Sequence, residues 1–222
     1  MGQTWEDLLF AHWRVPEDIV RPHLPASLAV DLHGGSAWLG VTPFRLTNFR
    51  LRGMLPIPGL NSFLELNVRT YVVAGDRPGI WFFSLDASSQ LAVDLARRTY
   101  KLPYFRARMS MTRRSDAIDY ECARVEEPGR VFSGSYRPAG AAVAPADGSR
   151  ESFLTERYCL YTTDEAGVLY RAEIHHEPWA LQPAEAEIGL VSIVPVELPD
   201  EPPLCHYSHR QDVVIWPLEA VT

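Results

Sequence analysis

The chain has 222 residues, of which 46% are hydrophobic, and this is enough apolar material to bury a sizeable core. Its net charge of −7 argues against general affinity for nucleic acid or anionic membranes, because neutralising phosphate is what drives such binding. The cysteines Cys122, Cys159 and Cys205 are widely spaced, which favours free thiols in a reducing compartment. No secretory signal is evident and no apolar stretch approaches the roughly 20 residues that span a bilayer, so we expect a cytoplasmic protein without a membrane partner.

The first half of the chain predicts short strands separated by turns. The expected strands are residues 8–13, 29–32, 37–41, 62–73 and 80–85. Pro16 followed by two acids predicts a short helix, and His33-Gly34-Gly35 predicts a hairpin between the second and third strands. Residues 50–61 hold several glycines and prolines, which predicts a loop that could act as a lid. The strand at 80–85 is apolar on both faces and is therefore expected at the centre of a sheet.

The second half combines one clear helix with further strands. Residues 90–99 form an amphipathic helix that Ser88 or Ser89 can cap, and residues 149–155 predict a shorter one. The expected strands are residues 104–112, 118–125, 157–161, 168–175, 205–209 and 213–216. Turns are expected at 114–116 and 164–167, and the small residues of 140–148 predict a surface loop. Because no linker separates these elements, we expect one α+β domain over residues 1–222 with a mostly antiparallel sheet.

The strand at 62–73 carries its charged side chains on only one of its faces. Its even positions include Leu64, Leu66, Val68 and Val72, whereas its odd positions place Glu65, Asn67 and Arg69 between Phe63 and Tyr71. Two interpretations remain open on the sequence alone. The odd face is either a solvated outer surface or the wall of a polar, partly dehydrated cavity in which Glu65 and Arg69 surround a ligand.

The segment 97–114 has seven basic residues and no acid, interleaved with aromatic residues. A surface that binds single-stranded nucleic acid has this composition, but so do strand arginines that pair with acids on neighbouring strands. A site for a carboxylate or phosphate ligand is the third interpretation. Since the chain is acidic overall, we expect no nucleic-acid partner and keep the ion-pairing and small-ligand interpretations open.

The histidines do not form a convincing metal site. Adjacent residues on a strand point to opposite faces, so His175 and His176 cannot easily serve one ion. His175, which lies at a strand end before Pro178 and Trp179, is instead a candidate acid or base at the edge of a pocket. The sequence lacks the glycine-rich phosphate loops and the G-x-S-x-G motif. We therefore expect no metal and no cofactor.

Five segments of the chain match motifs of a known family. They are Leu8 to Trp13, Ser62 to Tyr71, Leu102-Pro103-Tyr104, Leu154 to Tyr158 and His175 to Trp179. Together they resemble the YqjF-like family of uncharacterised bacterial proteins, which is related in fold to acetoacetate decarboxylase. The resemblance implies a strongly curved, mostly antiparallel sheet, a partly closed barrel with a few short helices around a polar cavity.

The same resemblance bears on the mechanism through the one lysine in the chain. Acetoacetate decarboxylases carry a Gly-Arg-Glu segment followed by aromatic-Pro-Lys, whose lysine forms a Schiff base. Here Arg97 matches the arginine, Tyr104 replaces the nucleophilic lysine, and Glu65 resembles an acid of the cavity wall. A phenol cannot form an imine, so Schiff-base chemistry would require Lys101, which precedes Tyr104 by three residues.

We therefore expect a cavity that Glu65, Arg69, Arg97 and Tyr104 line, with His175 at its edge. In the leading hypothesis it binds, and non-covalently transforms, a small organic acid or ester. An arginine holds the carboxylate while Tyr104 and Glu65 handle protons. The alternatives are a decarboxylase or lyase that uses Lys101 and a non-catalytic oligomeric or regulatory protein. A homodimer is expected only because dimers are common.

Overall fold

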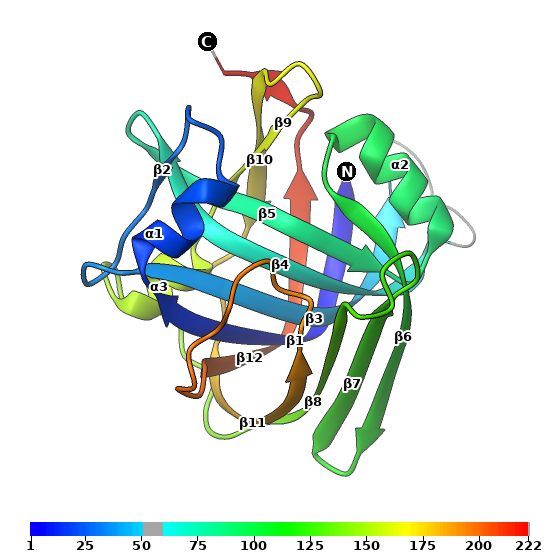
Figure 1. The fold of residues 1–222 in the computed structure, drawn as a ribbon. Coiled ribbons are helices and arrows are strands. Elements are labelled where there is room, and N and C mark those ends of the chain that lie inside the picture. Colours follow the sequence, from blue (N-terminus) through cyan, green and yellow to red (C-terminus); the bar gives the residue numbers. More distant parts are fainter. Residues whose placement is uncertain (51–59, 222) are drawn as a thin grey trace.

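The computed structural model describes residues 1–50 and 60–221. The loop expected at 50–61, with its lid role, falls largely outside the described residues. Within them the chain forms short helices and many strands (Figure 1). The helices are α1 (Glu17–Val20), α2 (Gln90–Tyr100) and α3 (Arg150–Thr155), with the 3-10 turn η1 (Arg21–His23) after α1. The strands are β1 (Gly2–Val15), β2 (Ala29–Val30), β3 (Ala37–Arg50), β4 (Ser62–Ala74), β5 (Arg77–Ala87), β6 (Tyr104–Arg114), β7 (Ala117–Arg124), β8 (Val131–Pro138), β9 (Cys159–Thr163), β10 (Leu169–His176), β11 (Gln182–Val191), β12 (Leu204–Ile215) and β13 (Glu219–Ala220).

All of these strands belong to one strongly curved sheet of 13 strands. The pairings β4–β5 and β10–β12 close part of it into a ring of hydrogen-bonded strands. The strands of this ring, in order, are β1, β3, β4, β5, β9, β10 and β12. From β5 the sheet also continues through β6, β7, β8 and β11 back to β12. The pairings of β5 with β6 and with β9 are parallel. Every other pairing between the described strands is antiparallel.

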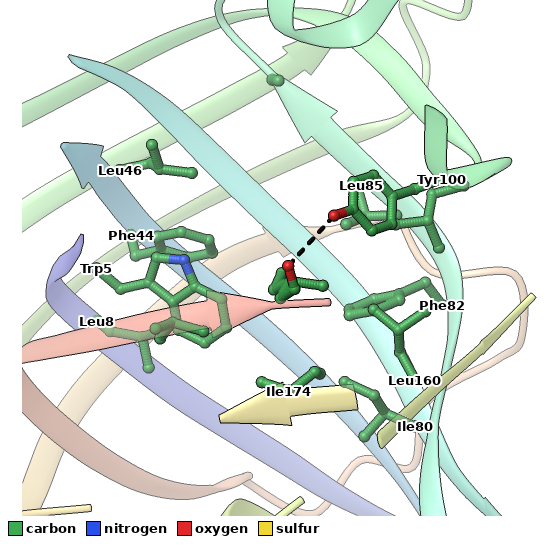
Figure 2. Close-up of a cluster of buried hydrophobic side chains, with 14 of the residues drawn as sticks. Trp5, Leu8, Phe44, Leu46, Ile80, Phe82, Leu85, Tyr100, Leu160 and Ile174 are labelled. Carbon is green, nitrogen blue, oxygen red and sulfur yellow. Dashed lines mark hydrogen bonds between the residues drawn. The ribbon is translucent and has the colours of Figure 1, made fainter. Parts of the chain in front are cut away.

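The sheet separates two hydrophobic clusters. Side chains alternate across each strand, so β1, β3, β4 and β12 give one face to each cluster. The first cluster fills the ring, and Figure 2 shows part of it, with Trp5, Phe44 and Ile174 directed into the same interior space. The second cluster lies on the other face of these strands, where Ile118, Phe132 and other side chains of β6 to β8 pack against them. These four strands are consequently buried on both faces over much of their length.

The expected fold class is confirmed, since the chain forms a mostly antiparallel, strongly curved sheet with a few short helices. Helix α2 begins as expected, because the Ser89 hydroxyl accepts from the Ala92 N–H at 3.3 Å. It ends at Lys101, which adopts the left-handed conformation with φ of 51° before Pro103. The hairpin expected at Arg114-Ser115-Asp116 is confirmed by the antiparallel pair β6–β7.

Three expectations about the strands are wrong. The segment at 29–32 does not form a hairpin with 37–41, because β2 pairs with β4 and only the bridge His33–Ser36 closes the intervening turn. The strands expected at 205–209 and 213–216 are one continuous strand, β12. The strands β8 and β11 were not expected at all, because their alternation includes small and charged residues that resemble a loop.

Candidate functional site

The polar face of β4 points into the ring. Glu65, Asn67 and Arg69 are 3%, 4% and 5% exposed, and their neighbours Phe63 and Tyr71 belong to the first cluster. The apolar even side chains of the same strand, Leu64, Leu66, Val68 and Val72, lie in or against the second cluster. The interpretation of this face as a solvated surface is therefore wrong. Three polar side chains are held in a dehydrated interior, where each must find a partner or shift its protonation.

Glu65 and Tyr104 meet inside the ring. The parallel pairing of β5 with β6 sets Tyr104 beside Leu85, and the Tyr104 hydroxyl donates to Glu65 Oε2 at 3.2 Å. Burial raises the pKa of Glu65 from 4.5 to about 8, and the nearby Asp86 carboxylate adds to this direction. Burial, together with the Glu65 charge, raises the pKa of Tyr104 well above its ordinary value. At neutral pH both groups hold their protons, and the expected contact between them is confirmed.

A cavity of about 290 Å³ lies next to Tyr104 beneath α2, and we call it the α2 pocket. Its lining residues are Met1, Gln3, Leu46, Phe49, Phe63, Ala92, Leu95, Ala96, Thr99, Tyr100, Tyr104, Pro217 and Leu218. None of these side chains is charged. Glu65 is not one of these lining residues. Its hydrogen bond with Tyr104 connects it to the pocket wall.

Helix α2 forms one wall of this pocket through small and apolar side chains. Ala92, Leu95 and Ala96 face it at spacings of three and four residues, so they share one side of the helix. The polar groups of Thr99 and Tyr100 are already bonded, to the Leu95 carbonyl at 2.8 Å and to the Ile215 carbonyl at 3.3 Å. The dashed line in Figure 2 marks the Tyr100 bond. The side chains of α2 therefore shape the pocket wall, and the hydroxyl groups of Thr99 and Tyr100 already donate their hydrogens within the protein.

Gln3 is the exception among the polar lining residues. It lies on β1, is only 7% exposed, and its side-chain amide makes no hydrogen bond to any of the residues described. An amide offers both donors and an acceptor. Sequence reasoning missed this residue because the expected first strand began at Leu8, whereas β1 begins at Gly2.

Arg97 lies away from the α2 pocket. It is exposed on α2, and its Nε donates to the Tyr104 backbone carbonyl at 2.7 Å. Its side chain lines a separate surface cleft with Arg98, Lys101 and Asp164. The expectation that Arg97 lines one cavity with Glu65 is therefore wrong. The cause is helical geometry, because Arg97 follows the inward-facing Ala96 by one residue, or about 100° around the helix.

Lys101 also lies outside the pocket. Its side chain is exposed, and its Nζ is 5.2 Å from the centre of the Tyr170 ring. The left-handed conformation that ends α2 turns Lys101 toward the surface cleft that it shares with Arg97. The amine is consequently not placed beside Glu65 or Tyr104.

Arg69 is buried at a different part of the ring, beside α3. Its Nη2 donates to the Leu154 carbonyl at 3.1 Å, and its Cζ lies 5.3 Å from the centre of the Phe10 ring. The Tyr71 hydroxyl donates to the same carbonyl at 2.7 Å. Arg69 has no ion pair with any described carboxylate. It sits four residues from Glu65 on β4, about 13 Å along the strand.

The strand β10 places His176 inward and His175 outward. His175 is exposed, so its expected place at the edge of the cavity is wrong. His176 is 5% exposed, stacks on Tyr158 with ring centres 4.6 Å apart, and has a pKa that burial lowers. A second missed histidine, His12, is 1% exposed, and its Nε2 lies 2.7 Å from the Tyr71 hydroxyl. Burial and the charge of Arg69 hold the pKa of His12 well below its ordinary value.

Across residues 1–50 and 60–221, no three His, Cys, Asp or Glu side chains gather as a metal ion requires. Over the same residues, no helix combines the length and the apolar character needed to cross a bilayer.

Solved structures with the same fold include several acetoacetate decarboxylase-like proteins. The enduracididine biosynthesis enzyme MppR, complexed with pyruvate, gives a TM-score of 0.71 at 12% identity, with 100% of this chain and 90% of that chain covered. An acetoacetate decarboxylase gives 0.68 at 12% identity, covering 100% and 89% of the two chains. An acetoacetate decarboxylase-like enzyme from Sphingomonas wittichii RW1 gives 0.66 at 15% identity, covering 100% and 92%. At these identities the similarity shows the fold alone.

Closer relationships come from the sequence. The protein YqjF of Bacillus subtilis (strain 168), itself described as uncharacterised, is 47% identical over 221 residues, which cover 98% of this chain and 91% of that protein. The model of the DUF2071 family, described as an uncharacterised conserved protein, matches residues 2–212. The chain therefore belongs to the DUF2071 family, with YqjF as a relative and the acetoacetate decarboxylase-like fold as its architecture.

Proposed function

We propose that the protein binds a small organic acid or ester in the α2 pocket and acts on it by non-covalent acid–base chemistry through Tyr104 and Glu65. The observation that carries this proposal is the buried hydrogen bond between these two side chains at the pocket wall. A cavity of about 290 Å³ with mostly apolar walls and few polar groups is typical of a small-ligand site. The pyruvate bound to the fold neighbour MppR supports a small oxygen-bearing ligand as the type.

The chemistry follows from the protonation of the pair. A ligand oxygen that accepts the Tyr104 hydrogen leaves the phenol oxygen able to accept from protonated Glu65. Because the pKa of Glu65 is about 8, this carboxyl group can give up or regain a proton near neutral pH. The pair can thus polarise a carbonyl group and move a proton without any covalent intermediate.

The position of Lys101 supports a non-covalent mechanism. A Schiff base requires an amine beside the bound carbonyl, and Lys101 lines the surface cleft instead of the α2 pocket. We expect borohydride treatment in the presence of a β-keto acid to leave the mass of the protein unchanged. An adduct on Lys101 would show that the Schiff-base alternative is correct.

The test of the proposed function is a thermal-shift and calorimetry screen of small acids and esters. A ligand at 100 times its Kd should stabilise the protein by about 2.7 kcal/mol. Tyr104→Phe should bind the same ligand about tenfold more weakly, the loss expected for one hydrogen bond of about 1.4 kcal/mol. The matched control is Tyr158→Phe, since Tyr158 is half-exposed and donates to Glu156 away from the pocket.

Equal affinity of the wild type and Tyr104→Phe for every ligand that binds would contradict the proposal. A screen in which neither acids nor esters stabilise the protein would favour the non-catalytic oligomeric or regulatory alternative.

A further inference from the structure

We propose that the ligand of the α2 pocket is an uncharged carbonyl compound with a compact apolar body, an ester or a ketone, and not a carboxylate. This inference rests on the proposed function and narrows it to one ligand class. It is carried by the composition of the pocket walls, by the free amide of Gln3 and by the size of the cavity.

Among the residues that the structure describes, no charged side chain lines the pocket to pair with a carboxylate. Both candidate arginines lie elsewhere. Arg97 opens into the surface cleft, and Arg69 holds the Leu154 carbonyl beside α3. The α-amino group of Met1 donates to the Ile215 carbonyl at 2.6 Å. Among the lining residues described, this ammonium group is the single cation, so a carboxylate that moves from water into these mostly apolar walls loses its hydration with little compensating charge.

Gln3 supplies what an uncharged carbonyl group needs. Its side chain is buried, lines the pocket and has no hydrogen-bond partner among the described residues. The amide atoms of Gln3 are not sealed from solvent, so its N–H groups can donate to a ligand oxygen in the pocket. Tyr104 is a second donor on the same pocket, with its hydrogen now directed at Glu65. Two neutral donors suit a carbonyl oxygen, whereas they cannot neutralise an anion.

The cavity sets the size of the ligand. A volume of about 290 Å³ accommodates on the order of ten non-hydrogen atoms at about 30 Å³ for each water-sized group. Much of this space exists because α2 presents the small side chains Ala92 and Ala96 to it. The apolar rings of Phe49 and Phe63 face the same space, which suits a hydrocarbon body better than a hydroxylated one.

The test compares three matched probes by calorimetry at pH 7: methyl hexanoate, 2-octanone and hexanoate. We expect the ester and the ketone to bind at least tenfold more tightly than the carboxylate. Gln3→Leu should weaken the ester at least fivefold, and Ala96→Phe, which fills the cavity, should abolish its binding. Ala142→Phe is the control, because it adds the same ring at an exposed loop residue outside the pocket. If Ala96→Phe does not fold, Ala96→Val should give an intermediate loss.

The outcomes separate this inference from the proposed function. Tighter binding of hexanoate, weakened by Tyr104→Phe, would overturn the inference and leave the proposed function standing. Failure of both neutral probes to bind would also overturn it. Binding of methyl hexanoate that Ala96→Phe and Gln3→Leu leave unchanged would place the ligand elsewhere and would contradict both.

Discussion

Glu65 is an acid whose environment opposes its charge. It lies on β4 inside the ring, 3% exposed, and burial raises its pKa from 4.5 to about 8. Between these two pH values the folded chain retains a proton that the unfolded chain has lost. The contribution of Glu65 to stability is therefore most favourable below pH 4.5 and declines as the pH rises to about 8.

This linkage gives a prediction for Glu65→Gln, which keeps the shape and cannot ionise. The variant should gain stability relative to the wild type as the pH rises from 5 to 8.5, by a few kcal/mol in the free energy of unfolding. Urea unfolding at several pH values measures it. Glu187→Gln is the control, because Glu187 is exposed on β11. A difference between Glu65→Gln and the wild type that stays constant over this range would contradict the assigned protonation.

A second buried acid, Asp86, differs from Glu65 because it has a cationic partner. Arg124 Nε donates to Asp86 Oδ1 at 2.9 Å and Nη2 to Oδ2 at 3.1 Å, with both side chains almost fully buried. Removing one member of a buried pair leaves the other charge uncompensated. Asp86→Asn should therefore cost about 3–5 kcal/mol of unfolding free energy.

The matched control is Asp119→Asn. Asp119 pairs with Arg114 at the surface, where such pairs contribute about 0–1 kcal/mol. Chemical denaturation of both variants measures the comparison. Similar losses of unfolding free energy for the two substitutions would show that burial of the Asp86–Arg124 pair does not increase its contribution to stability.

At the scale of single residues, the sequence predicts a side chain's direction wherever a strand is regular. The alternation in 62–73 was enough to place Glu65 and Arg69 on one face, because a strand has a period of two. On β10 the same period of two places His176 on the buried side with Ala172 and Ile174. It places His175 on the opposite, exposed side. Gln3 could not be found this way, because the local pattern before Leu8 did not identify a strand.

Helix α3 is held against the ring by side chains of β4. Helix α3 has only six residues and is marginal by itself, and its Leu154 carbonyl accepts from both Arg69 and Tyr71. This contact occupies only the Nη2 of the buried Arg69 guanidinium, since its Nε has no partner among the described residues. It predicts that Arg69 holds α3 against the ring, and a substitution can test this.

Arg69→Met should loosen α3 because it removes a charged donor from the Leu154 carbonyl. We expect a loss of about 1.5–3 kcal/mol, the contribution typical of a hydrogen bond to a charged group. Hydrogen exchange of the amides of residues 150–157 should accelerate more than that of α2. Arg150→Met, on the exposed side of α3, is the control. Unchanged protection of α3 in Arg69→Met would favour a ligand-binding role for this arginine.

At the scale of elements, local signals predicted helices and hairpins but not the long-range pairings. The Ser89 cap and the turn at Ser115 follow from the chemistry of nearby residues. By contrast, Trp5 on β1 pairs with Gln211 on β12, near the other end of the chain. The periodicity of a short segment cannot predict a pairing between residues so far apart in the sequence. The positions of Arg97 and Lys101 were missed for a local reason: Arg97 lies about 100° around α2 from the inward-facing Ala96, and Lys101 adopts the left-handed conformation that ends the helix.

At the scale of the whole molecule, the fold is shared with enzymes that differ from this chain at most positions. MppR and acetoacetate decarboxylase match the architecture over the full chain, yet only 12% of the residues are identical. In this chain Tyr104 stands where the resemblance would place a nucleophilic lysine, and the remaining lysine faces a different cleft. The common fold therefore does not imply a common reaction.

The two hydrophobic clusters share their strands, and we propose that residues 1–222 unfold as one domain. Because β1, β3, β4 and β12 pack in both clusters, losing either cluster exposes the same backbone. Ile174→Ala in the first cluster and Phe132→Ala in the second should cost about 2–5 and 3–5 kcal/mol. Each should lower one common urea midpoint, followed by tryptophan fluorescence and far-ultraviolet circular dichroism. Val143→Ala, at an exposed site, should leave the midpoint unchanged. Separate transitions for the two probes in either core variant would show two independent units.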